Sequence, residues 1–158
     1  MPQLITAEDI ASASFTITLA SLGNGSARQS TLLDNSNDYP SAIIYLALKS
    51  GASPPTDGAQ YEVYLLRGNK HGGASTYRTD GAGATDAAIT IVNALPLGTI
   101  RVTAAANTFF YGEFDTGWIG PLGPEWGIAV KNASGQALNA ADHVAEYVYT
   151  VPELQAAV

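Results

Sequence analysis

The stretch Trp118-Ile-Gly-Pro-Leu-Gly-Pro-Glu-Trp-Gly-Ile-Ala-Val-Lys-Asn132 contains two Gly-Pro steps followed by a mostly apolar run. The residue before a proline is biased toward an extended conformation, and proline itself cannot donate to a strand ladder. We therefore expect an ordered crossing loop from Gly120 to Pro124 and a strand from Trp126 to Lys131. The two tryptophans of the chain, Trp118 and Trp126, flank this loop, which predicts that buried aromatic area holds the crossing in place.

On both sides of this stretch, apolar and polar residues alternate with the period of half-buried strands. The expected strands cover residues 14–20, 27–33 (an edge or outer strand), 42–49 (a central strand covered on both faces), 61–67, 88–92, 99–105, 126–131 and 143–151. Ala129 to Leu138 is expected to turn back as a hairpin around Asn132-Ala-Ser-Gly135. About eight strands with turn residues between them predict an all-β fold, a single antiparallel β-sandwich that is jelly-roll-like.

The chain of 158 residues is long enough for one domain with a core, and no shift in composition indicates a second. We expect an N-terminal arm over residues 1–13, the sandwich over 14–151 and a C-terminal tail over 152–158. Thr6 and Asp9 have a spacing that also allows a short helical turn in the arm. The first residues lack the basic and apolar segments of an export signal, and no apolar run approaches ~20 residues, so we expect neither a signal nor a membrane span.

Charged residues make up only 13% of the chain, against roughly a quarter in ordinary globular proteins. The surface must therefore be built from neutral polar and small residues, which suits a protein packed in an assembly, although ordinary sandwiches also have it. The net charge is −7, and the seven basic residues are scattered singly. This pattern argues against direct binding of nucleic acid. The absence of cysteine excludes disulfides and thiolate chemistry.

Asp34, Ser36 and Asp38 are spaced like the first three ligands of a calcium-binding loop. The motif then fails, because Tyr39 replaces the required glycine and Tyr45 stands where the bidentate acid belongs. We therefore interpret this segment as a loop with side-chain-to-backbone turns, not as a metal site.

Other polar groups also favour structural roles. The glycine-rich run from Asp80 through Gly81 and Gly83 to Asp86 lacks the lysine and the strand-loop-helix context of a phosphate-binding loop. His71 and His143 belong to no metal-binding spacing, and we expect each at a loop or strand end.

The sequence contains no nucleophile motif, so we predict no catalytic residue, no cofactor and no metal. Glu113 with Asp115, or Asp115 with Glu125, remains an open carboxylate pair of the kind that glycosidases use.

Tyrosine and tryptophan side chains provide a different kind of candidate site, because exposed rings can stack on sugars. The residues concerned are Tyr64, Tyr77, Tyr111 and Trp118. The alternative, which we favour, is that these rings fill the core and its ends.

Five segments of the chain resemble a family of small structural proteins from tailed bacteriophages. They are Arg28-Gln-Ser-Thr-Leu-Leu-Asp-Asn-Ser, Tyr39-Pro-Ser-Ala-Ile-Ile-Tyr-Leu, Glu62-Val-Tyr-Leu-Leu-Arg, Arg78-Thr-Asp-Gly and Gly120-Pro-Leu-Gly-Pro-Glu-Trp-Gly-Ile-Ala-Val-Lys-Asn. The resemblance covers about residues 26 to 150 and implies a virion protein, with decoration (cement) of the outer head surface as the preferred role and a tail or adaptor component as the next.

The partners implied are the major capsid protein and copies of the chain itself, with no direct nucleic acid and no membrane. The protein is then expected on the phage head, after synthesis in the host cytoplasm. We hypothesise that the two ends dock on neighbouring subunits, and the candidate partner-binding residues are Met1, Pro2, Gln3, Leu4, Ile5, Leu154, Val158 and Trp118. The competing class is an adhesion module that binds a surface glycan through its aromatic loops.

Overall fold

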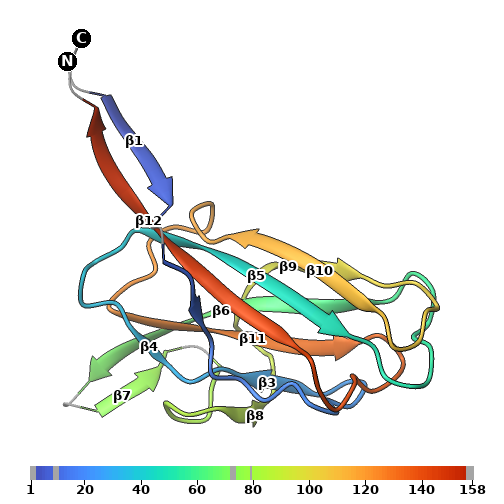
Figure 1. Ribbon diagram of the computed structural model, residues 1–158. Helices are drawn as coiled ribbons and strands as arrows, with labels where there is room; N and C mark the ends of the chain where they lie inside the picture. The colour runs from blue at the N-terminus through green and yellow to red at the C-terminus, as the bar shows by residue number, and fades with distance from the viewer. Residues whose placement is uncertain (1–2, 9–10, 72–73, 79, 156–158) are drawn as a thin grey trace.

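The computed structural model describes residues 3–8, 11–71, 74–78 and 80–155. These residues contain twelve β-strands and no helix, and the strands form two antiparallel sheets packed face to face (Figure 1). Eight of the twelve have four residues or more. The prediction of an all-β antiparallel sandwich is confirmed.

The first sheet, sheet A, contains β1 (Gln3–Glu8), β12 (Val144–Gln155), β5 (Ser41–Lys49) and β10 (Phe109–Asp115) in that order, and β2 (Ala13–Ser14) also pairs with β12. The second, sheet B, has the order β7 (Ala74–Tyr77), β6 (Gln60–His71), β11 (Glu125–Ala133), β3 (Ala27–Gln29) and β8 (Ala87–Ile89). Two more strands join this sheet: β4 (Leu33–Asp34) pairs with β11, and β9 (Leu95–Arg101) pairs with β6. The connections from β9 to β10, β10 to β11 and β11 to β12 each cross between the sheets, so the chain winds around the core in a jelly-roll-like manner.

Strand alternation places one face of each sheet in the core. On β5, the side chains of Ala42, Ile44, Leu46 and Leu48 are buried, and the residues between them are half-buried. The expected central position of this strand is confirmed, because β5 lies between β12 and β10. The expected cover on both faces is wrong, since the outer face of sheet A has no second layer of described elements against it.

The centre of the core is an aromatic cluster around Trp126, which is fully buried. Its ring makes edge contacts with Phe15, Tyr147 and Tyr149, and its Nε1–H donates to the hydroxyl of Tyr149 at 3.1 Å. Burial raises the pKa of Tyr149 to about 12 despite this hydrogen bond, so the phenol stays protonated.

The crossing loop between β10 and β11 passes from sheet A to sheet B as expected, and the fully buried side chain of Leu122 anchors it. Trp126 also fulfils the expectation of buried aromatic area. Trp118 does not, because 67% of it is exposed to solvent. The sequence pattern could not indicate which of the two tryptophans is buried, since both lie near the same prolines.

The prediction of a full strand over residues 14–20 is wrong in its pairing, although its alternating burial is correct. Only β2 joins a ladder, while Phe15 and Leu19 point into the core. The Phe15 N–H donates to Ala145 in sheet A, and the Thr16 carbonyl accepts from Thr31 near sheet B. The segment therefore crosses from one sheet to the other and closes the end of the core.

Three further expectations need correction. The segment 129–138 is no hairpin, because the strand after Asn132 belongs to the other sheet, and the Asn132 side chain closes the turn by bonding Leu22 and Gln136. Strand β9 begins at Leu95 instead of Thr99, since Pro96 is accommodated at a bulge opposite β6. The segment 27–33 is divided into β3 and β4, and β3 is not an edge, because β8 pairs with its far side.

Candidate partner-binding surface

The two ends of the described chain meet in a two-stranded ribbon that projects from the sandwich (Figure 1). From Val144 to Thr150, β12 pairs with β5, but its continuation to Gln155 pairs only with β1. The register sets Gln3 opposite Gln155 and Glu8 opposite Thr150. The expected arm and tail are thus partners of each other at one end of the molecule.

The ribbon leaves the sandwich where the ladder between β12 and β5 ends. Continuing that register would set Pro152 opposite Tyr39, but proline has no N–H to donate. The backbone of Tyr39 is also occupied, because the side chain of Asn35 accepts its N–H at 3.1 Å and donates to its carbonyl at 3.0 Å. Both sides of the next hydrogen-bonded pair after Thr150 and Ser41 are therefore unable to extend the ladder, and β12 continues with β1 alone.

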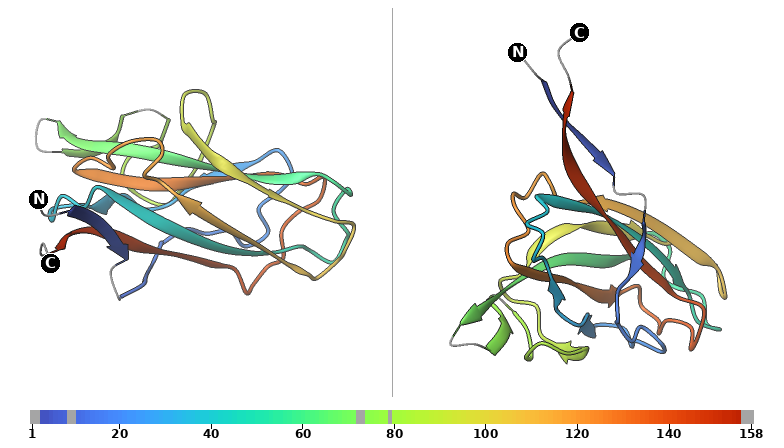
Figure 2. Two further views of the ribbon diagram at one scale, coloured as in Figure 1. Left: turned by 90° about the horizontal axis from the view of Figure 1, so that it is seen from above. Right: turned by 60° about the vertical axis from the view of Figure 1, so that its left-hand side comes forward.

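Trp118 belongs to the loop after β10, and the start of this loop is held near the base of the ribbon. In the chain segment just before Trp118, the N–H of Thr116 donates to Ala42 at 3.0 Å, which fixes the loop at the beginning of β5. The neighbouring residue Ser41 shares a hydrogen bond between its hydroxyl and that of Thr150, where the ribbon begins. Figures 1 and 2 both show the loop after β10 beside the ribbon base. The exposed Trp118 therefore belongs to a loop that starts beside the ribbon base.

The structure brings together most of the predicted partner-binding residues that it describes. Gln3, Leu4 and Ile5 lie on β1, and Leu154 lies directly opposite Leu4 on β12. Trp118 lies in the loop that starts near the ribbon base, and no sequence signal related it to either end. Three more of the predicted residues, Met1, Pro2 and Val158, lie outside the described residues.

The histidine and calcium-like candidates have structural roles where their side chains are described. His143 accepts the Lys49 N–H at its Nδ1 atom and contacts the Asn139 carbonyl through Nε2 at 2.8 Å, so both ring nitrogens hold the end of β5. His71 lies at the end of β6, as expected for a strand end. In the 34–39 loop, the side chain of Asn35 makes side-chain-to-backbone bonds to Tyr39 and Gly123. No cluster of three potential metal ligands occurs within the described residues.

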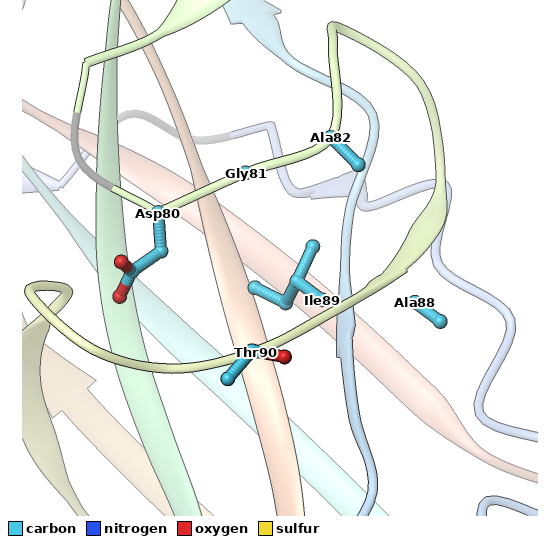
Figure 3. A pocket seen from close by; sticks show the side chains of 6 residues that line it. All are labelled: Asp80, Gly81, Ala82, Ala88, Ile89 and Thr90. Atoms are coloured by element: carbon cyan, nitrogen blue, oxygen red, sulfur yellow. The ribbon is translucent and has the colours of Figure 1, made fainter.

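The glycine-rich run forms a hollow of about 530 Å³ next to β8, lined by Asp80, Gly81, Ala82, Ala88, Ile89 and Thr90 (Figure 3). The Oδ2 atom of Asp80 accepts the N–H groups of Val92, Asn93 and Ala94, each at 2.7 Å. Nearby, Asp86 binds the guanidinium of Arg28. Both carboxylates therefore fasten loops, in agreement with the structural role expected for this run.

The fold keeps one of the two open glycosidase-like pairs on a single face and separates the other. Glu113 and Asp115 are two residues apart on β10 and share the outer face of sheet A, where Asp115 accepts the Gly117 N–H at 2.7 Å. Glu125 begins β11 in the other sheet and is buried. Asp115 and Glu125 are thus not brought together on one surface.

Of the four aromatic candidates, one (Tyr77) is buried, one (Tyr64) is half-buried, and two are exposed. The hydroxyl of Tyr77 donates to Ser30, and that of Tyr64 donates to Glu62. Tyr111 is 74% exposed and, like Trp118, faces solvent. It borders a hollow of about 550 Å³ on the outer face of sheet A, lined by Tyr45, Leu46, Ala47, Tyr111, Gly112, Glu113 and Val144.

Two surfaces in the described part of the chain thus offer exposed aromatic area, the loop of Trp118 that starts beside the ribbon base and the outer face of sheet A at Tyr111. The described residues contain no helix long and apolar enough to cross a bilayer. Comparisons with protein-family models, with curated proteins and with solved structures gave no match. The geometry of these two surfaces is therefore the basis for the functional proposals.

Proposed function

We propose that this protein is a non-enzymatic structural protein of a tailed bacteriophage that decorates the outer surface of the head. The observation that carries the proposal is the exposed Trp118 in a loop that starts beside the base of a ribbon built from both chain ends. The five segments that resemble phage structural proteins point in the same direction. The partner is the major capsid protein, and the ribbon base is the contact surface.

The physical properties of the molecule support this role. A decoration protein needs a compact body and a projecting element, and Figure 2 shows a sandwich from which the ribbon projects. Tryptophan is the residue most enriched among energetically dominant interface residues. Covering the exposed part of Trp118 would contribute about 3 kcal/mol from its apolar area alone. Each copy then needs only a small interface, because the repeated head lattice multiplies its effect.

The proposal is tested by mixing the purified protein with undecorated heads of the phage that encodes it and measuring co-sedimentation and survival of the heads on heating. We expect saturable binding that raises the temperature of head disruption. Trp118→Ala should weaken the binding at least about tenfold. The matched control is Val92→Ala, which truncates a side chain with 72% exposure in the loop between β8 and β9.

Failure of the wild-type protein to bind heads would refute the decoration role. Binding to isolated tails in the same assay would assign the protein to the tail or its adaptor. Equal loss of binding in the Trp118 and Val92 variants would show that the ribbon base is not the contact surface.

The outer face of sheet A favours a second candidate function, recognition of a surface glycan. Tyr111 presents its exposed ring beside the apolar hollow, and Glu113 stands next to it as an acceptor for sugar hydroxyls. A glycan array with the isolated protein tests this function. Binding that disappears in Tyr111→Ala and persists in Trp118→Ala would support it, and an array without any signal would rule out the glycans tested.

A further inference from the structure

The outer edge of β1 is an unpaired strand edge. Among the described residues, sheet A ends at β1, and no strand lies against its far side. The ribbon stands away from the sandwich, so the body of the domain does not cover this edge (Figures 1 and 2). An isolated pair of strands is only marginally stable in water, and an open edge invites a further strand.

The backbone groups on that edge follow from the register. Within an antiparallel strand, the N–H and C=O of one residue point to the same neighbour, and the direction alternates along the strand. The Ala145 carbonyl accepts the Phe15 N–H at 2.9 Å, so the odd-numbered residues of β12 face the N-terminal segment. Val151, Glu153 and Gln155 therefore bond to Ala7, Ile5 and Gln3.

The remaining residues of β1, Leu4, Thr6 and Glu8, direct their N–H and C=O groups to the open edge. The opposite edge of the ribbon belongs to Pro152 and Leu154, and there Pro152 has no N–H. The edge of β1 thus has a full set of donors and acceptors, while the edge of β12 lacks the N–H donor at Pro152. A docking strand has better partners on β1.

We propose that this edge binds β1 of a second copy, so that two chains join into one continuous sheet with the order β12-β1-β1′-β12′. An antiparallel copy centred on Thr6 sets Thr6 opposite Thr6 and Leu4 opposite Glu8. Every outward N–H and C=O of both strands then has a partner, and the contact closes as a two-fold dimer.

Charge favours the same pairing. Glu8 is the one charged residue of β1. In the register centred on Thr6, the two Glu8 positions lie four residues apart along the strands, roughly 13 Å, which is beyond the screening length of about 8 Å at physiological salt. A register centred on Glu8 would set the two carboxylates opposite each other and lose most of the pairs.

Sedimentation velocity of the purified full-length chain over a range of concentrations tests the dimer without any phage component, so its result is independent of the proposed function. We expect a monomer–dimer equilibrium for the wild type. Thr6→Pro removes an N–H from the open edge and leaves the ladder to β12 intact, so it should raise the dimer dissociation constant at least about tenfold. Leu154→Pro, the matched control, alters only the other edge and should dimerise like the wild type.

A single cysteine provides a second test, because the chain contains none. Thr6→Cys faces its own copy across the two-fold axis, within the Cα separation that a disulfide spans, so mild oxidation should yield a covalent dimer. Leu4→Cys faces Glu8 of the other copy and should remain monomeric on denaturing gels. A wild type that stays monomeric at all concentrations, or equal cross-linking of the two cysteine variants, would overturn the inference.

Discussion

Replacing Asp80 with alanine removes the carboxylate that holds the loop between β8 and β9. Its Oδ2 atom accepts three backbone N–H groups at 2.7 Å, and a hydrogen bond to a charged group contributes about 1.5–3 kcal/mol. Val92 and Asn93 are exposed, so their N–H groups can turn to water after the substitution, whereas Ala94 is buried. We therefore expect the free energy of unfolding to fall by about 2–4 kcal/mol at neutral pH, not by the sum of three buried bonds.

The same carboxylate makes this loss depend on pH. Burial raises the pKa of Asp80, but the hydrogen bonds from Val92, Ala94 and Asn93 together outweigh burial and hold the pKa below its ordinary value. A carboxyl group with a lower pKa in the folded state stabilises the fold above the unfolded-state pKa, about 4, and this contribution is lost as the pH falls through the folded-state pKa. The difference between wild type and Asp80→Ala should therefore shrink under acidic conditions.

Urea unfolding followed by tryptophan fluorescence at neutral pH and at about pH 3 measures both effects. The control is Asp57→Asn, which removes a carboxylate from an exposed loop and should change stability by less than about 0.5 kcal/mol. A loss below about 0.5 kcal/mol for Asp80→Ala at neutral pH, or the same loss at both pH values, would refute the role assigned to Asp80.

Three further outcomes are expected. Gly127→Ala should lower the free energy of unfolding by about 2–3 kcal/mol in urea melts, because the added methyl would collide with the hydroxyl of Tyr77; an unchanged melt would contradict this packing. Burial raises the pKa values of Tyr77 and Tyr149 to about 12, so an ultraviolet titration should show late ionisation, and stability should fall as the pH rises above about 10, where unfolded tyrosines ionise first. Trp118→Ala should leave stability within about 0.5 kcal/mol, since the side chain is exposed, and a larger loss would indicate unseen packing.

Residue patterns in the sequence predicted the features that depend on local alternation. Tyr61, Val63 and Leu65 share the buried face of β6, as their spacing indicates, and Gly120 to Pro124 crosses between the sheets. A period of two specifies which side chains share a face, and proline cannot donate a hydrogen bond to a ladder. Both rules act within a few residues, so they can be applied before any partner strand is known.

The candidate surface could be predicted only in part. Leu4 and Leu154 were predicted to bind a partner because they lie near the two ends of the chain. Nothing in the sequence indicated that they lie opposite each other. Trp118 and Trp126 have similar surroundings in the sequence, yet one is exposed and the other fully buried. Which tryptophan enters the core depends on how β10 and β11 are placed in different sheets.

The sequence by itself thus determined the all-β class, the inner face of β6 and the crossing loop. The tertiary structure alone decided that residues 14–20 close the core as a crossing segment, that the segment 129–138 is no hairpin, and that the two ends pair as a ribbon. The physical reason is that burial patterns are encoded locally, whereas strand partners and register depend on contacts between residues far apart in the chain, which no single segment specifies.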